Sequence, residues 1–230
     1  METKSSGSVK RSFAVFQKDI KSELRTRYAI NAILLFAVVT VFAVSFAMAK
    51  SGGMVAPVLQ SSLLWIVIYF SSLSGLAQSF IKEEESKTAI ALRLYAPAES
   101  VFGGKLLFNL VLLIVMNIIT IPLFAIFLNL EIANYPLFFS VVFLGSLAMV
   151  GTTTLVAAII SKASVKGALF AVLSFPLLLP VLMMAISGTK KALSPDITFA
   201  MARMELQVLG SYLVIMIVLG FFLFDAVWND

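Results

Sequence analysis

Six long stretches of the chain contain no charged residue. They cover residues 30–49, 51–81, 106–130, 132–161, 167–189 and 206–224. About 20 apolar residues in an α-helix cross a hydrocarbon core ~30 Å thick, so each stretch can cross a membrane once. None of them alternates polar and apolar positions as the strand of a membrane barrel does. The pattern predicts six transmembrane helices, at about 30–48, 59–80, 107–127, 137–160, 168–186 and 208–224.

The composition supports the same class of protein. The chain has 230 residues, of which 60% are hydrophobic and only 13% are charged. A soluble domain is nearer half apolar and a quarter charged, so a soluble globular enzyme is excluded. We therefore predict an all-α integral membrane protein in which residues 29–230 form one six-helix transmembrane domain.

The segment before the first predicted span has a different pattern. Residues 1–10 are small and polar, and we expect a disordered tail there. Residues 11–28 are amphipathic: Phe13, Phe16, Ile20 and Leu24 follow one helical stripe, and basic residues lie off it. Such a helix can lie in the headgroup plane as a membrane-surface anchor. It can also be an elbow helix that touches a cytoplasmic partner, and the two interpretations are compatible.

The basic residues are unevenly distributed between the two ends of the predicted spans. Thirteen of the 17 Lys and Arg residues lie in the N-terminal segment and in the second and fourth loops. Cytoplasmic loops of membrane proteins carry this excess. The distribution predicts that both termini are cytoplasmic, in agreement with an even number of spans.

The longest predicted cytoplasmic connection, residues 82–105, begins with three adjacent glutamates, Glu83, Glu84 and Glu85. Residues 89–95 are expected to form a short helix that stops before Pro97. The charge pattern has two interpretations. One is a solvated run that keeps the loop out of lipid, and the other is a docking element that fits a cleft on another protein.

Several kinds of chemistry are excluded by missing residues. The chain has no Cys and no His, which removes thiolate nucleophiles and imidazole bases or ligands. It also has no phosphate-binding loop and no nucleophile elbow. No charged residue interrupts a span, so the usual relay of an ion-driven transporter is missing. We predict that the chain is not an enzyme and that any transport takes its energy from another subunit.

Polar and proline residues inside the predicted spans leave two readings open. Asn117, Thr120 and the run 152–154 are typical either of helix-packing contacts or of a substrate site. Pro176 and Pro180 remove two backbone donors from the fifth span. They predict either a static kink or a helix break that serves as a hinge or lines a groove.

Taken together, these residues resemble a known family over about residues 13–224. The resemblance rests on Phe13, Lys18-Asp19 and Glu23-Leu24-Arg25 in the leader, the Glu83–Glu85 turn, Tyr95-Ala96-Pro97, Lys105, and the Pro176…Pro180-Val181 pair. The order resembles haem exporter protein B, the permease subunit of the cytochrome c maturation ABC transporter. More loosely, it is similar to other six-span ABC-2-type exporters.

The resemblance implies a function and a set of partners. The chain would be a permease of the bacterial inner membrane that couples a partner ATPase to haem export, or to release of a haem-loaded periplasmic chaperone. Its partners would be that ATPase, a second copy of itself, a haem-handling membrane subunit, the periplasmic haem chaperone and the lipid bilayer, with no nucleic acid.

The resemblance also implies roles for individual residues. The ATPase-coupling loop would contain Glu83, Glu84, Glu85, Arg93, Tyr95 and Pro97. This chain alone would bind no cofactor or metal; ATP would bind the partner subunit, and haem would be handled by the whole complex. The alternatives are a permease for a drug, lipid or polysaccharide, and a membrane scaffold that transports nothing.

Overall fold

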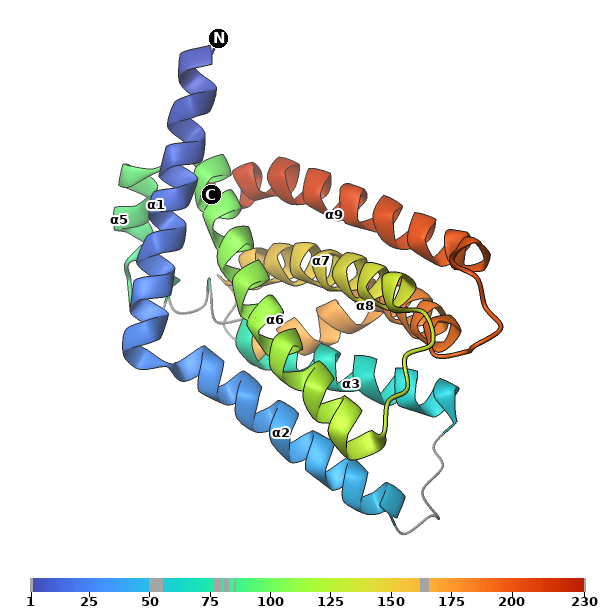
Figure 1. Ribbon diagram of the computed structural model, residues 1–230. Coiled ribbons are helices and arrows are strands. Elements are labelled where there is room, and N and C mark those ends of the chain that lie inside the picture. The colour runs from blue at the N-terminus through green and yellow to red at the C-terminus, as the bar shows by residue number, and fades with distance from the viewer. Residues whose placement is uncertain are drawn as a thin grey trace.

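The computed structural model describes residues 2–49, 56–76, 80, 83–84, 86–161 and 166–229. These residues are almost entirely helical, and none of them forms a strand. The helices, shown in Figure 1, are α1 (Glu2–Thr26), α2 (Tyr28–Ala49), α3 (Pro57–Leu76), α5 (Ala89–Tyr95), α6 (Ala98–Leu128), α7 (Tyr135–Ile160), α8 (Lys166–Ala192), the 3₁₀ helix η1 (Phe199–Ala202) and α9 (Arg203–Asn229).

Most of these helices have the length and composition of membrane spans. In the described part of the chain, five helices are long and apolar enough to cross a bilayer, namely α2, α6, α7, α8 and α9. The prediction of an all-α integral membrane protein is therefore confirmed. The count of six spans stays a prediction, because the apolar part of α3 is the shorter segment Pro57–Leu73.

The central helix of the bundle is α7. Of the 18 consecutive residues that form the apolar part of α7, 78% are buried, against 17% in the corresponding parts of α2 and α9. Figure 1 shows α7 running between α9 and α8, the two helices with which it packs most extensively. The outer helices instead expose large apolar side chains such as Phe42, Ile118 and Phe222, as surfaces in contact with lipid do.

One close approach in the core involves a glycine of α7. A Cβ atom added to Gly145 would lie 2.4 Å from the Trp65 ring of α3, so only glycine leaves room for that indole. Trp65 is fully buried, and its Nε1 donates a hydrogen bond of 2.8 Å to Thr189 Oγ1 in α8. Trp65 thus links three helices, and its polar atom is satisfied as a buried indole requires.

Helix α1 packs across the beginning of α6. A Cβ atom added to Gly104 would lie 2.7 Å from the Ser12 carbonyl oxygen, which shows how closely the two backbones approach. One turn earlier on each helix, the hydroxyl oxygens of Ser8 and Ser100 are 3.0 Å apart. In Figure 1 α1 and α5 lie at the end of the bundle where α6 begins and α9 ends, and both chain termini are at this end.

The connection from α1 to α2 is a sharp elbow. Arg27 has a φ of 53°, in the left-handed region that helices commonly use where they end. The Glu23 carboxylate then accepts a hydrogen bond of 3.0 Å from Ile30 N, one of the free backbone donors in the first turn of α2. Glu23 therefore fixes the direction in which the chain leaves α1.

Several predicted boundaries differ from the structure. Residues 2–10, expected as a disordered tail, continue α1 back to Glu2, and the amphipathic helix expected over 11–28 ends at Thr26. The spans expected to start at 107 and at 208 start at Ala98 and Arg203, and α8 continues to Ala192 rather than 186. The predicted spans were confined to the charge-free stretches, so no charged residue was placed inside a span. In the structure the charged residues continue the helices, and several of them form ion pairs.

Candidate functional site

The short helix α5 lies in the connection between α3 and α6, as the sequence predicts. It spans Ala89–Tyr95 and ends before Pro97, the N-cap residue of α6. Leu92 and Ala96 are buried in a cluster with side chains of α6 and α9. The other side of the helix is open: the exposed fraction is 86% for Leu94 and 66% for Tyr95. Helix α5 thus has one face fixed to the bundle and one apolar face without a partner in the described part of the chain.

A buried lysine of α6 joins the segment before α5 to helices α1 and α6. The Lys105 side chain, on α6, is 2% exposed. Its Nζ lies 3.0 Å from Asp19 Oδ2 on α1 and 3.1 Å from Glu83 Oε1. Lys18 pairs with the same two carboxylates, which completes a four-residue charge network. Because a buried cation is costly without partners, the network fixes the relative positions of the three segments.

The pKa values of two network residues reflect this arrangement. Burial alone would raise the pKa of Glu83, but the nearby Lys105 charge and hydrogen bonds from Lys18 and Thr88 lower it to about 2. Burial opposes the charge of Lys18, yet its pKa is raised above the usual value because Asp19 and Glu83 stabilise the ammonium. Both groups are therefore charged at neutral pH.

The helix α5 is also joined to the end of α9. The Arg93 guanidinium lies 5.2 Å from the centre of the Trp228 ring, at cation–π distance. Trp228 stacks on Phe224, and Phe224 contacts both Phe80 and Phe102. A row of aromatic rings thus extends from α5 to the start of α6 and the end of α9.

The predicted coupling residues occupy different environments. Glu83 belongs to the buried network, Glu84 is half-buried, and Arg93 faces α9. Tyr95 and Pro97 are exposed, and Glu85 lies outside the described residues. Whether these residues couple to an ATPase stays a prediction.

Four residues of the site were not identified from the sequence as members of one site, namely Lys18, Asp19, Lys105 and Trp228. A signal for Asp19 exists: Val15, Asp19 and Glu23 repeat every four residues and make one buried face of α1. The position of Lys105 close to a predicted span was also visible. Their convergence on Glu83 depends on how α1 crosses α6, which no local pattern shows.

The predicted membrane-surface stripe of α1 divides into two groups. Phe16 and Ile20 are half-buried against the core, whereas Phe13 and Leu24 are exposed. The buried face lies beside this stripe rather than on it, because the helix rests on α6 through Val15 and Asp19. The role of the stripe as a membrane-surface anchor stays a prediction.

The two prolines of α8 do not interrupt the helix. α8 is continuous over Lys166–Ala192, and both Pro176 and Pro180 are exposed. Next to Pro176, the Leu177 carbonyl oxygen accepts a hydrogen bond from the Tyr212 hydroxyl of α9. The break that the sequence allowed is thus not present in this conformation, and a hinge stays a prediction.

Polar side chains inside the bundle link helices to one another. Asn109 Nδ2 donates to Thr154 Oγ1 at 2.9 Å, and Asn117 Nδ2 donates to Ser146 Oγ at 2.7 Å, both between α6 and α7. Thr152 and Thr153 donate to backbone carbonyls of their own helix. These contacts favour the packing interpretation of the intramembrane polar residues.

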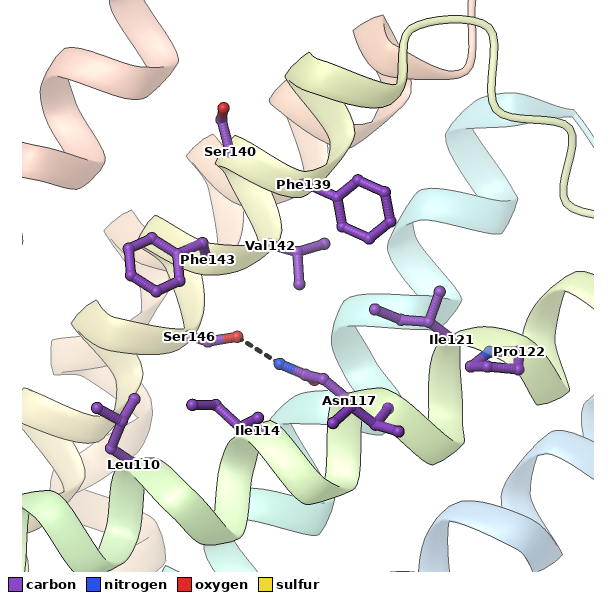
Figure 2. Close-up of a pocket in the computed structure, with 11 residues that line it drawn as sticks. Leu110, Ile114, Asn117, Ile121, Pro122, Phe139, Ser140, Val142, Phe143 and Ser146 are labelled. Atoms are coloured by element: carbon purple, nitrogen blue, oxygen red, sulfur yellow. Dashed lines mark hydrogen bonds between the residues drawn. The ribbon is translucent and has the colours of Figure 1, made fainter.

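An open groove of about 780 Å³ runs between α6 and α7. Figure 2 shows Leu110 and Ile114 on one wall, Phe139 and Phe143 on the other, and the Asn117–Ser146 hydrogen bond between them. The lining is almost entirely apolar. The groove has the chemistry of a surface that contacts acyl chains or another membrane helix.

At the opposite end of the bundle a second ion pair joins α8 to α9. Lys191 Nζ lies 2.6 Å from Glu205 Oε1, which also accepts a hydrogen bond of 2.8 Å from Ser187. The backbone N–H groups of Ala133 and Asn134 donate to the Ala192 carbonyl oxygen. These contacts join the loop between α6 and α7 to the same corner.

Among the described residues, no group of acidic side chains is arranged to hold a metal ion. The fold and these contacts define a class: a multi-pass helical membrane protein with a charged assembly of short and surface helices at one end. A family model described as CcmB protein matches residues 10–228. The chain therefore belongs to the CcmB family, and its resemblance to haem exporter protein B is confirmed.

Membership of this family defines the chain in general terms. It is a membrane component of the cytochrome c maturation ABC transporter, and the family is a permease family rather than a catalytic one. The comparison with curated proteins gives no match.

Proposed function

We propose that this chain is the permease subunit through which a separate ATPase drives haem export or the release of a haem-loaded periplasmic chaperone. The observation that carries the proposal is the exposed apolar face of α5, formed by Leu94 and Tyr95. Large apolar side chains on a short helix outside the spans favour a protein partner. Membership of the CcmB family supports an ATPase as that partner.

In this proposal, movement of the ATPase reaches the spans through contacts on both sides of α5. A displacement of α5 acts on α9 through Arg93 and Trp228. It acts on α6 and α1 through the preceding segment, because Glu83 pairs with Lys105 and Lys105 pairs with Asp19. The ATPase hydrolyses the nucleotide, and this chain converts the movement into a change in how its spans pack.

The same proposal includes the remaining partners and the location. The chain works in the bacterial inner membrane with both termini in the cytoplasm, as a pair of copies, beside a haem-handling membrane subunit and the chaperone. The sequence contains no histidine, so any imidazole ligand of the haem iron comes from those partners. No nucleic acid takes part.

The experiment uses a single substitution on the exposed face of α5. Leu94→Glu places a charge where the partner surface is expected to be apolar, and the side chain is too exposed to be needed for folding. We expect ATPase binding to weaken at least tenfold and c-type cytochromes to be lost, while b-type cytochromes remain. Lys190→Glu, at an exposed position at the opposite end of the bundle, is the matched control.

Two results would overturn the proposal. If the Leu94→Glu chain binds and stimulates the ATPase as the native chain does, α5 is not the coupling element. If deletion of the chain leaves c-type cytochromes unchanged, it does not act in their maturation. A chain that assembles its partners without any effect on ATP hydrolysis would instead be a scaffold.

A further inference from the structure

Helix α1 separates its charges by sign. Within residues 7–26, the two acidic residues, Asp19 and Glu23, are both buried against the bundle. The basic residues Lys10, Arg11, Lys21 and Arg25 are all exposed, and none of them forms an ion pair with another described residue. The outward surface of α1 is therefore cationic, although the helix as a whole contains both signs.

An apolar stripe lies beside these cations on the same outward surface. The exposed fraction is 67% for Val9, 51% for Phe13 and 60% for Leu24. These residues repeat at spacings of four and eleven, which keeps them on one line of a helix. The exposed half of α1 thus carries an apolar line and a cationic line side by side, with Gln17 between them.

This arrangement matches the boundary of a bilayer whose surface is negative. In a helix that lies in the interface, apolar side chains enter the acyl region while Lys and Arg reach the phosphates. Neutral headgroups satisfy the apolar line alone, whereas anionic headgroups also neutralise the cations, none of which forms an ion pair with another described residue. We propose that the cationic line of α1, formed by Lys10, Arg11, Lys21 and Arg25, is a binding surface for anionic phospholipid headgroups.

The position of α1 gives this binding surface a consequence for the bundle. α1 touches α6 along Ser12 and Val15 and pairs with Lys105 through Asp19. In this proposal, anionic headgroups bind the exposed side of α1, while the ion pair between Asp19 and Lys105 fixes its buried side to α6. The proposal does not depend on the ATPase, so its failure would leave the proposed function untouched.

The absence of native cysteine allows a direct test with the full chain. Gln17→Cys introduces one thiol between the two lines, and a fluorophore on that thiol reports on neighbouring lipid. The labelled chain is reconstituted in vesicles of phosphatidylcholine and phosphatidylglycerol in which only one of the two lipids carries brominated, quenching chains. We expect brominated phosphatidylglycerol to quench more strongly than brominated phosphatidylcholine at the same fraction.

Charge removal and salt complete the experiment. About 1 kcal/mol per cation near an anionic surface corresponds to roughly a fivefold change in binding. We therefore expect Lys21→Gln with Arg25→Gln to abolish most of the preference. The matched pair Lys190→Gln with Arg203→Gln, exposed cations near the other end of α8 and α9, should retain it. High salt should reduce the preference in the native chain without any substitution.

Three results would overturn the proposal. Equal quenching by both lipids in the native chain shows that α1 does not select anionic lipid. A preference that survives both high salt and loss of Lys21 and Arg25 has another source. Quenching by neither lipid shows that another protein surface, such as a second copy, covers this side of α1.

Discussion

At the scale of single residues, Lys105 is a buried cation with partners on two other segments of the chain. It is almost fully buried, and two carboxylates from different segments lie within 3.1 Å of its Nζ. The attraction between these charges offsets the cost of removing them from water only while the set is complete. Removing Lys105 is therefore expected to destabilise the chain mainly because Asp19 and Glu83 remain buried without it.

Lys105→Met is expected to destabilise the chain by about 3–5 kcal/mol, because Asp19 and Glu83 are then buried with too little positive charge. The combined variant Lys105→Met, Asp19→Asn, Glu83→Gln should recover much of that loss, since no unpaired charge then remains buried. Lys18 loses its two carboxylate partners, but its side chain is 45% exposed and stays solvated. Thermal unfolding in detergent measures both. If Lys105→Met alone were as stable as the native chain, the ion pairs of Lys105 would contribute little to the free energy of unfolding.

The contact between Gly145 and Trp65 gives a second prediction at this scale. Gly145→Ala inserts a Cβ atom 2.4 Å from the buried ring and should cost about 1–3 kcal/mol through overpacking. Gly210→Ala in α9 is the matched control, because no other described heavy atom lies within 4 Å of the added Cβ, apart from its chain neighbours and the backbone of its own helix. Equal melting temperatures for the two variants would contradict the close packing of α3 on α7.

At the scale of elements, the joint between α1, the segment before α5, and α6 depends on ionisation. The folded pKa of Glu83, about 2, is lower than the ordinary carboxyl value of 4.5. Its contribution to stability is therefore present above pH 4.5 and is lost as the pH falls from there towards 2. The pKa of Lys18 is raised above 10.5, so its contribution is present below that pH and is lost as the pH rises beyond the raised value.

A comparison of pH profiles tests this joint. The melting temperature of the native chain should fall between pH 4.5 and 2 more steeply than that of Glu83→Gln, which has no carboxylate at this position to protonate. Glu131→Gln, an exposed carboxylate in the loop between α6 and α7, is the control and should follow the native profile. Parallel curves for the native chain and Glu83→Gln would show that Glu83 has no effect on stability in acid.

The helix α8 gives a different prediction, since its two prolines are kept in a continuous helix. Pro176→Ala with Pro180→Ala restores two backbone donors and should raise thermal stability, by up to about 3 kcal/mol per proline. If the prolines act as a hinge, the stabilised chain should also stimulate the ATPase less. Unchanged stimulation in a more stable chain would favour a static role.

The elements could be predicted far better than their contacts. Charge-free length predicts the five long apolar helices of the described chain, and Pro97 predicts the end of α5, because both signals are local. The helices were predicted too short where a charged residue near the end of a span, such as Lys105 or Glu205, pairs with a residue of another helix. The direction of Arg93 towards Trp228 likewise depends on how the helices cross.

At the scale of the whole molecule, the chain consists of a lipid-facing bundle with its charged contacts at the two ends. Glu205 and Lys191 pair at one end, and the network around Lys105 joins α1, α6 and the segment before α5 at the other. Membership of the CcmB family agrees with this division, since a permease needs spans in lipid and an end that meets other subunits. In the proposed function, α5 forms the part of this end that meets the ATPase.

Cross-linking in the assembled transporter can show whether α5 meets the ATPase, because the chain has no cysteine of its own. Tyr95→Cys places one thiol on the exposed face of α5, and Lys190→Cys places one at the other end of the bundle. In the assembled transporter, a short thiol-to-amine cross-linker should join Tyr95→Cys, but not Lys190→Cys, to the ATPase subunit. Cross-linking of the ATPase to Lys190→Cys, with none to Tyr95→Cys, would show that the ATPase meets the other end of the bundle and not α5.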